Sequence, residues 1–310
     1  MIFRLFQTNR LFGYILSYVV TLVFMVFAFP GFELVEGSLL YHLIGNSLIA
    51  QTVTFLFIVL LLPYSMISFF EKHQLHKKSV YFQYFLFLLL TFPVFLKGDI
   101  QDMVLLPLLI SILNLLMSSY NKTKANIEIA QIGLLFGILV LLKLESLFLL
   151  PFMIIGMAVF RSFVLKDILQ LVLCAVSVPL LLYGFDMNGH LGIAERMIDG
   201  FGEILSFSTV HFGHYVPLIP ASVFSLIAFF NLISRVNYLA IRQQLNRYVF
   251  IWLALFSTLL LFVESAGDLG VYFFALAAIV PLNYYFKTIK SRFWSDVQIV
   301  LIAGVAAWLM

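Results

Sequence analysis

Long apolar stretches follow one another through almost the whole chain, and only short polar connections separate them. Eleven such stretches lie at 11–29, 49–70, 80–96, 103–119, 129–142, 146–160, 167–183, 217–234, 248–263, 269–286 and 294–310. A helix needs about 20 predominantly apolar residues to cross a bilayer. The pattern therefore predicts an all-α polytopic transmembrane protein of about eleven spans, with residues 1–310 forming a single transmembrane domain.

The segment 129–160 decides how many times the chain crosses. As a single helix it would be roughly 48 Å long, too long for a hydrocarbon core of about 30 Å. Basic residues flank it on both sides, with Lys122 before it and Arg161 after it, which places both ends on the same side of the membrane. The polar step at 143–146 predicts the tip of a hairpin. Each arm is short, so a full hairpin and a re-entrant hairpin both remain open.

Basic residues are distributed unevenly among the connections. Fifteen of the 18 lysines and arginines lie in the N-terminal segment or in every second connection, and only Lys97, Lys143 and Arg196 lie in the others. Cytoplasmic loops carry such an excess of positive charge. The pattern predicts a membrane protein with its N-terminus in the cytoplasm and its C-terminus on the outer side of the membrane.

Composition supports the same class of protein. Apolar residues make up 63% of the chain, charged residues 11%, and the mean hydropathy is +1.08, which excludes an ordinary soluble globular protein. The single cysteine, Cys174, excludes an internal disulfide framework. The net charge of +3 follows from the topology. It predicts contact with anionic membrane lipids rather than with nucleic acid.

Candidate catalytic residues are the carboxylates of the outward loops. Glu33 and Glu36 lie three residues apart in the connection 30–48, and Asp99 and Asp102 repeat this spacing in 97–102. A carboxylate can act as a general base or as a ligand for a divalent metal. Acidic residues are also common in short outer loops simply because they are soluble there. The connections 30–48, 97–102 and 184–216 form the candidate functional face.

The three outward cations are candidates for binding a lipid phosphate. Arg196 can clamp a phosphate through paired hydrogen bonds, and Lys97 and Lys143 can contribute to the same site. An ion pair between Arg196 and a neighbouring acid is the alternative. His211 and His214 could hold a metal with an outward carboxylate, or form a hydrogen-bonded pair at the interface. His73 and His76, which lie among lysines, are interpreted as a solvated basic surface.

Dispersed positions resemble a family of Bacteroidota inner-membrane proteins of unknown function and of similar length. The matching features are Met1-Ile2 with Phe6 before the first span, Pro93, Gly133 and Gly137 ahead of Pro151, Phe160-Arg161, Pro179, and Pro281-Leu282. This resemblance implies a multi-pass protein of the bacterial inner membrane, with its C-terminus in the periplasm, and no particular activity.

A broader resemblance is to the GT-C class of glycosyltransferases, which use polyprenyl-phosphate-linked sugars. It rests on the glycine-rich stretch 133–137, the step 143–146 and the Leu150-Pro151 pair. The resemblance implies a catalytic acid after the first span, here Glu33 or Glu36. The chain departs from the class because glutamate replaces aspartate, no adjacent acidic pair is present, and no soluble C-terminal domain follows.

Together with the charged residues of the outward loops, the resemblance implies a protein of cell-envelope biogenesis, with a GT-C-like transferase acting at the outer face as the first interpretation. One carboxylate would take the acceptor proton and Arg196, with Lys97 or Lys143, would hold the leaving phosphate. The first alternative is a non-enzymatic membrane subunit of an envelope assembly or protein-export complex. The second is a lipid or small-molecule transporter, although ionisable residues in mid-span, which transporters use, are almost missing.

Overall fold

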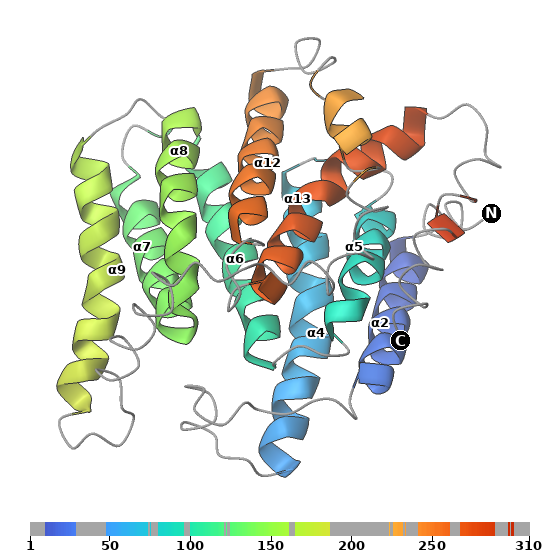
Figure 1. The fold of residues 1–310 in the computed structure, drawn as a ribbon, viewed down its shortest axis with the longest axis horizontal. Coiled ribbons are helices and arrows are strands. Elements are labelled where there is room, and N and C mark those ends of the chain that lie inside the picture. The colour runs from blue at the N-terminus through green and yellow to red at the C-terminus, as the bar shows by residue number, and fades with distance from the viewer. Residues whose placement is uncertain are drawn as a thin grey trace.

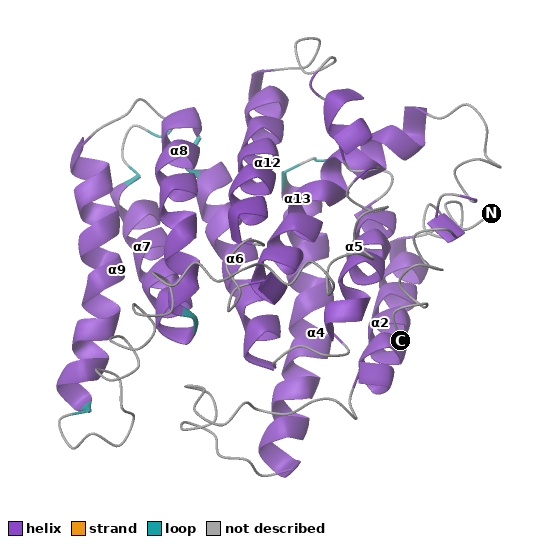
Figure 2. Cartoon of the chain, viewed as in Figure 1, coloured by secondary structure: helices purple, strands orange, loops and turns teal. Residues whose placement is uncertain are grey.

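The computed structural model shows an all-helical protein in the part of the chain that it describes (Figures 1 and 2). This part comprises residues 10–28, 48–73, 75, 80–95, 100–120, 122, 125–160, 165–186, 223, 226–231, 233, 241–260, 267–288, 297 and 299–300. Its elements are α2 (Arg10–Ala28), α4 (Leu48–Lys72), α5 (Val80–Phe95), α6 (Ile100–Ser118), α7 (Asn126–Leu142), the 3-10 helix η2 (Leu144–Leu149), α8 (Leu150–Phe160), α9 (Leu165–Phe185), α12 (Ile241–Leu260) and α13 (Gly267–Thr288).

Nine of the predicted spans coincide with an α-helix. The all-helical class is therefore confirmed for the described residues. Of the spans predicted at 217–234 and 294–310, only scattered helical residues are described. Two helical segments, Thr52–Lys72 and Leu165–Phe185, are long and apolar enough to cross a membrane by themselves, and six others are apolar but shorter.

Hydrogen bonds between helix ends place several of these ends on one face of the bundle. Lys72 at the end of α4 donates to Asn114 near the end of α6, and Asn246 near the start of α12 donates to the carbonyl of His73. Gln170 of α9 donates to the carbonyl of Asn126 at the start of α7. We call this face the basic end, because Lys72, Lys122, Lys166 and Arg247 lie there.

The opposite face contains the turn between α7 and α8, at 143–146, and we call it the hairpin end (Figure 1). The segment 129–160 is therefore two helices joined by a short turn, as the flanking charges predict. Whether this hairpin crosses a membrane completely stays a prediction.

The core lies between α4, α5, α6, α12 and α13. In α13 every residue from Val271 to Asn283 except Phe274 is buried. The ring of Phe82 in α5 packs edge-on against the ring of Phe286 in α13, with 5.9 Å between the ring centroids. The bundle is flanked by α9 on one side and α2 on the other (Figure 1). These two flanking helices keep large apolar side chains exposed, including Ile15, Val19 and Leu22 of α2 and Leu169, Leu173 and Leu180 of α9.

Glycine brings α7 and α9 into close contact. A Cβ atom added to Gly133 would lie 2.6 Å from the carbonyl oxygen of Leu171, and one added to Gly137 would collide with the backbone of Ala175. Small residues four apart allow helix backbones to approach in membranes. The stretch 133–137, which carries the resemblance to glycosyltransferases, thus has a packing role in this fold.

A second seam of small residues joins α2 to α5. Gly13, Ser17 and Thr21 lie four residues apart on α2; the ring of Tyr81 covers Gly13, and Tyr84 bonds Thr21. Ser17 and Thr21 donate their hydroxyl protons to the carbonyl oxygens of Gly13 and Ser17, at 2.8 and 2.7 Å. Both polar side chains are thereby satisfied inside their own helix.

Candidate functional site

Most of the predicted site residues lie outside the part of the chain that the structure describes. These residues are Glu33, Glu36, Lys97, Asp99, Arg196, His211 and His214. Asp102 belongs to the first turn of α6, with its side chain outside the description. Since α6 ends at the basic end, this first turn lies towards the hairpin end. The grouping of these residues therefore stays a prediction, and Lys143 is the one whose surroundings are described.

Lys143 forms the turn at the hairpin end. Its backbone is extended, with φ −145° and ψ 110°, and it separates α7 from η2. Its N–H donates to the carbonyl of Leu139 at 3.0 Å, and its own carbonyl accepts from the N–H of Ser146 at 3.0 Å. These two bonds close α7 and start η2, so the position of Lys143 is fixed by the backbone on both sides.

The next polar residues, Glu145 and Ser146, lie inside the bundle rather than in a solvated loop. Glu145 is 8% exposed and Ser146 is 0% exposed. η2 packs against α7, α8 and α12, which together cover this tip. Among the described residues, the Ser146 hydroxyl has no hydrogen-bond partner. The burial of both residues agrees with the short arms of the hairpin, which predict a tip below the surface.

The hairpin tip thus brings a lysine, a carboxylate and a hydroxyl together within four residues. Burying a carboxylate costs free energy unless the carboxylate is paired. Ionisable residues buried within membrane proteins are therefore rare, and they usually have a function. A carboxylate can accept a proton, and a lysine ammonium can hold a phosphate oxygen. The sequence already contains the relevant signal, since the short arms of the hairpin predict that its tip lies below the surface.

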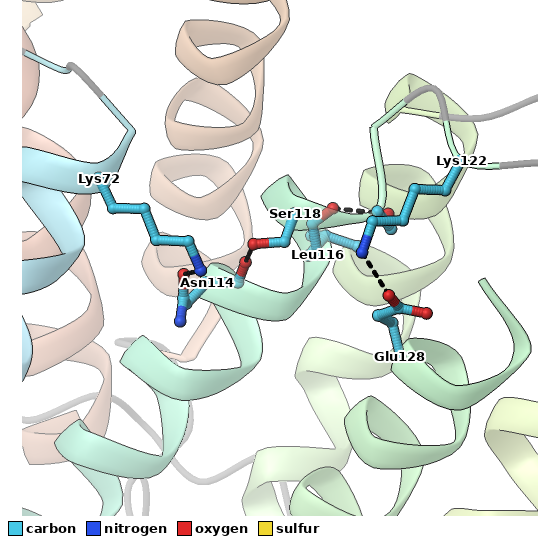
Figure 3. Close-up of polar contacts among 7 residues, drawn as sticks. Lys72, Asn114, Leu116, Ser118, Lys122 and Glu128 are labelled. Atoms are coloured by element: carbon cyan, nitrogen blue, oxygen red, sulfur yellow. Dashed lines mark hydrogen bonds and ion pairs between the residues drawn. The ribbon is translucent and has the colours of Figure 1, made fainter.

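A second polar cluster lies at the basic end, where α4 and α6 meet (Figure 3). Lys72 Nζ and His73 Nε2 both lie 2.9 Å from Asn114 Oδ1. An ammonium group can only donate, so Asn114 Oδ1 is the acceptor in both hydrogen bonds. Nε2 of His73 therefore carries a proton. His73 is 3% exposed, which corrects its interpretation as part of a solvated surface.

The start of α12 completes this cluster. Asn246 Nδ2 donates to the carbonyl of His73 at 3.4 Å, and the ring of Phe69 lies 6.2 Å from that of Phe250. Asn246 and the adjacent Arg247 are 2% and 6% exposed. Arg247 follows Asn246 on α12, so it lies at the same end of the bundle as Lys72.

The connection between α6 and α7 is closed by an ion pair between Lys122 and Glu128 (Figure 3). Ser118 and Ser119 donate to carbonyls of α6, at 2.6 Å each. Lys122 is exposed, and such surface pairs contribute little to stability. This pair is therefore a useful control for the buried cluster beside it.

Within the described residues, no group of three or more histidine, cysteine or acidic side chains could hold a metal ion. The predicted metal ligands His211 and His214 fall outside them, so the divalent metal stays a prediction. Comparison with protein-family models, with curated proteins and with solved structures gives no match.

Proposed function

We propose that the protein is a multi-pass protein of the bacterial inner membrane, with the basic end in the cytoplasm and the hairpin end in the periplasm. The orientation follows from the distribution of lysine and arginine along the chain. Two observations support the membrane location. Large apolar side chains stay exposed along α2, α4 and α9, where a soluble protein would expose polar ones. The seams at Gly133–Gly137 and Gly13–Thr21 use small residues, which is typical of helix packing in lipid.

We further propose that the protein is a transferase of envelope biogenesis with a GT-C-like arrangement, acting at the hairpin end on a polyprenyl-phosphate-linked sugar. The largely buried residue Glu145, two residues from Lys143, is the observation that carries this proposal. Lys143 holds the phosphate of the donor, and Glu145 takes the proton from the acceptor hydroxyl. Glu33, Glu36, Asp99 and Asp102 remain candidates for the same role.

One observation favours the alternative of a non-enzymatic docking subunit. Apart from Asp167 and Leu171, the residues of α9 are at least partly exposed, and this helix meets the rest of the bundle chiefly through α7. A helix attached along one seam could dock a helix of a partner protein. In that case the side chains at the hairpin tip would be replaceable.

The test replaces Glu145 by glutamine, which keeps the shape and removes the charge. We expect Glu145→Gln to lower the yield of the lipid-linked glycan product by about 10²–10⁴-fold, since this is the usual contribution of a general base. Lys143→Gln should also lower it. Product is measured in cells that carry the variant as their only copy.

Glu128→Gln is the matched control, because it removes a carboxylate at the other end of α7 where no chemistry is proposed. Protein level in the membrane fraction is measured for all variants. Unchanged glycans in the Glu145→Gln strain, at normal protein level, would exclude Glu145 as the base. Unchanged glycans together with loss of a co-purifying protein in α9 variants would favour the docking subunit.

A further inference from the structure

One buried amide at the basic end differs from the two described above. Asn114 accepts hydrogen bonds from Lys72 and His73, and Asn246 donates one to the carbonyl of His73. Gln83 of α5 is 0% exposed, and among the described residues neither its Nε2 nor its Oε1 has a hydrogen-bond partner. Gln83 is therefore the one of these three amides to which the described helices supply no hydrogen bond.

The side chain of Gln83 is directed into the bundle. Successive residues of an α-helix are turned by about 100°, so Phe85 lies on nearly the opposite side of α5 from Gln83. Between residues 80 and 91, Phe85 alone is not buried, so it marks the outer side of this helix. Phe82 packs against α13 and Tyr84 bonds α2, and Gln83 lies between them on the inner side, where α5 also packs against α4.

Gln83 also lies close to the end of its helix. It is the fourth residue of α5, and at about 1.5 Å per residue it lies roughly 4.5 Å from the first. Helix α5 begins at the basic end, because only the short connection 73–79 separates it from the end of α4. A water molecule at the depth of Gln83 does not have to cross the apolar centre of the bundle.

A buried carboxamide without hydrogen bonds is unfavourable, because nothing offsets the loss of its hydration. A carboxamide can donate from Nε2 and accept at Oε1 at the same time. One water molecule can accept the first of these bonds and donate the second, which satisfies both atoms. Buried waters in proteins typically bond polar groups that the protein itself leaves unsatisfied.

We propose that Gln83 is the binding site of an internal water molecule, enclosed where α5 meets α4 and α13 near the basic end. Gln83 Nε2 donates to the water, and the water donates to Gln83 Oε1. Because Gln83 is completely enclosed, a ligand as small as water fits beside it and a larger one has no access. The proposal holds for either orientation of the protein in the membrane, and it is independent of the proposed transferase activity.

The test is hydroxyl-radical footprinting of the full-length protein in detergent, with radicals produced from water by an X-ray pulse. Radicals formed from a bound water oxidise the side chains beside it, even where bulk solvent has no access. Phe87 is the reporter, since it lies one turn after Gln83 on the same side of α5 and is 0% exposed. Phe136 of α7, which is 1% exposed, is the matched control. We expect oxidation of Phe87 in the native protein, whereas Phe136 should stay at background.

Gln83→Leu removes both hydrogen-bonding atoms and should reduce the oxidation of Phe87 to the level of Phe136. Its unfolding temperature should stay close to that of the native protein, because the amide and its water are lost together. Background oxidation of Phe87 in the native protein would overturn the proposal, and this measurement does not depend on any variant. Oxidation of Phe87 that persists in folded Gln83→Leu would overturn Gln83 as the binding site. A clear rise in unfolding temperature would also overturn it, since the native amide would then be unbonded.

Discussion

At the scale of single residues, most described hydroxyl groups in the bundle bond to their own helix. Ser111 and Thr91, for example, donate to carbonyls four residues earlier, at 2.8 and 2.9 Å. This arrangement satisfies a polar side chain without a partner from another helix. The pair of Thr21 and Tyr84 is different, because it joins α2 and α5 at 2.7 Å. Since the Thr21 hydroxyl donates to the Ser17 carbonyl, Tyr84 is the donor in this pair.

This geometry predicts an asymmetric response to removing either hydroxyl. Tyr84→Phe leaves Thr21 bonded to Ser17 and should cost roughly 0.6 kcal/mol, as interhelical hydrogen bonds in membranes do. Thr21→Val leaves the buried Tyr84 hydroxyl unpaired and should cost about 1–3 kcal/mol. Thermal unfolding of the purified variants measures both. Equal destabilisation would show that the Tyr84 hydroxyl finds another partner.

At the scale of elements, the described glycines differ in what surrounds them, and this gives an ordered prediction. A methyl group at Gly137 meets the backbone of Ala175, one at Gly156 meets the flexible end of Leu116 at 2.6 Å, and one at Gly184 meets nothing within 4 Å. Gly137→Ala should therefore destabilise most, by roughly 1–3 kcal/mol. Gly156→Ala should cost less, because a side chain can move aside.

Gly184→Ala is the control for helix propensity and should be neutral or stabilising by up to about 1 kcal/mol. The unfolding temperatures of the three variants, measured under identical conditions, give the order. If Gly137→Ala were as stable as Gly184→Ala, the close approach of α7 and α9 would be wrong.

The helices themselves were predictable from the sequence, because their apolar length and the charges between them leave few alternatives. Even the turn at 143–146 follows from the basic flanks of the segment 129–160. The short arms of the hairpin also predict that its tip lies below the surface, but they do not specify which helix covers Glu145 and Ser146. Helix α12, which lies about a hundred residues away in sequence, packs against η2 and helps to cover Glu145 and Ser146.

The cluster at the basic end shows the same limit. His73 follows two residues that are exposed, and nothing local distinguishes it from His76 among the lysines. Its burial depends on Asn114 of α6 and Asn246 of α12, and such long-range pairs leave no periodic signal. Whether Glu33, Asp99 and Arg196 come together stays a prediction, because the sequence pattern does not specify such long-range contacts.

At the scale of the whole molecule, the two ends of the bundle differ in charge and the sides are apolar. The basic end holds Lys72, Lys122, Lys166 and Arg247 with the acids Glu71, Glu128 and Asp167, whereas the hairpin end holds Lys143 with the acids Glu145 and Asp186. The flanking helices α2 and α9 keep apolar side chains exposed along much of their length. This combination is typical of a membrane protein whose sides face lipid and whose cations lie on the cytoplasmic side.

The most direct test of this placement labels the two ends of one helix. Lys166 and Gly184 lie at opposite ends of α9 and both are exposed. Single cysteines are introduced at each position in a Cys174→Ser background, and spheroplasts are treated with a membrane-impermeant thiol reagent. We predict that Gly184→Cys is labelled in intact spheroplasts and that Lys166→Cys is labelled only after lysis. Labelling of both cysteines before lysis, or of Lys166→Cys alone, would contradict the proposed membrane orientation.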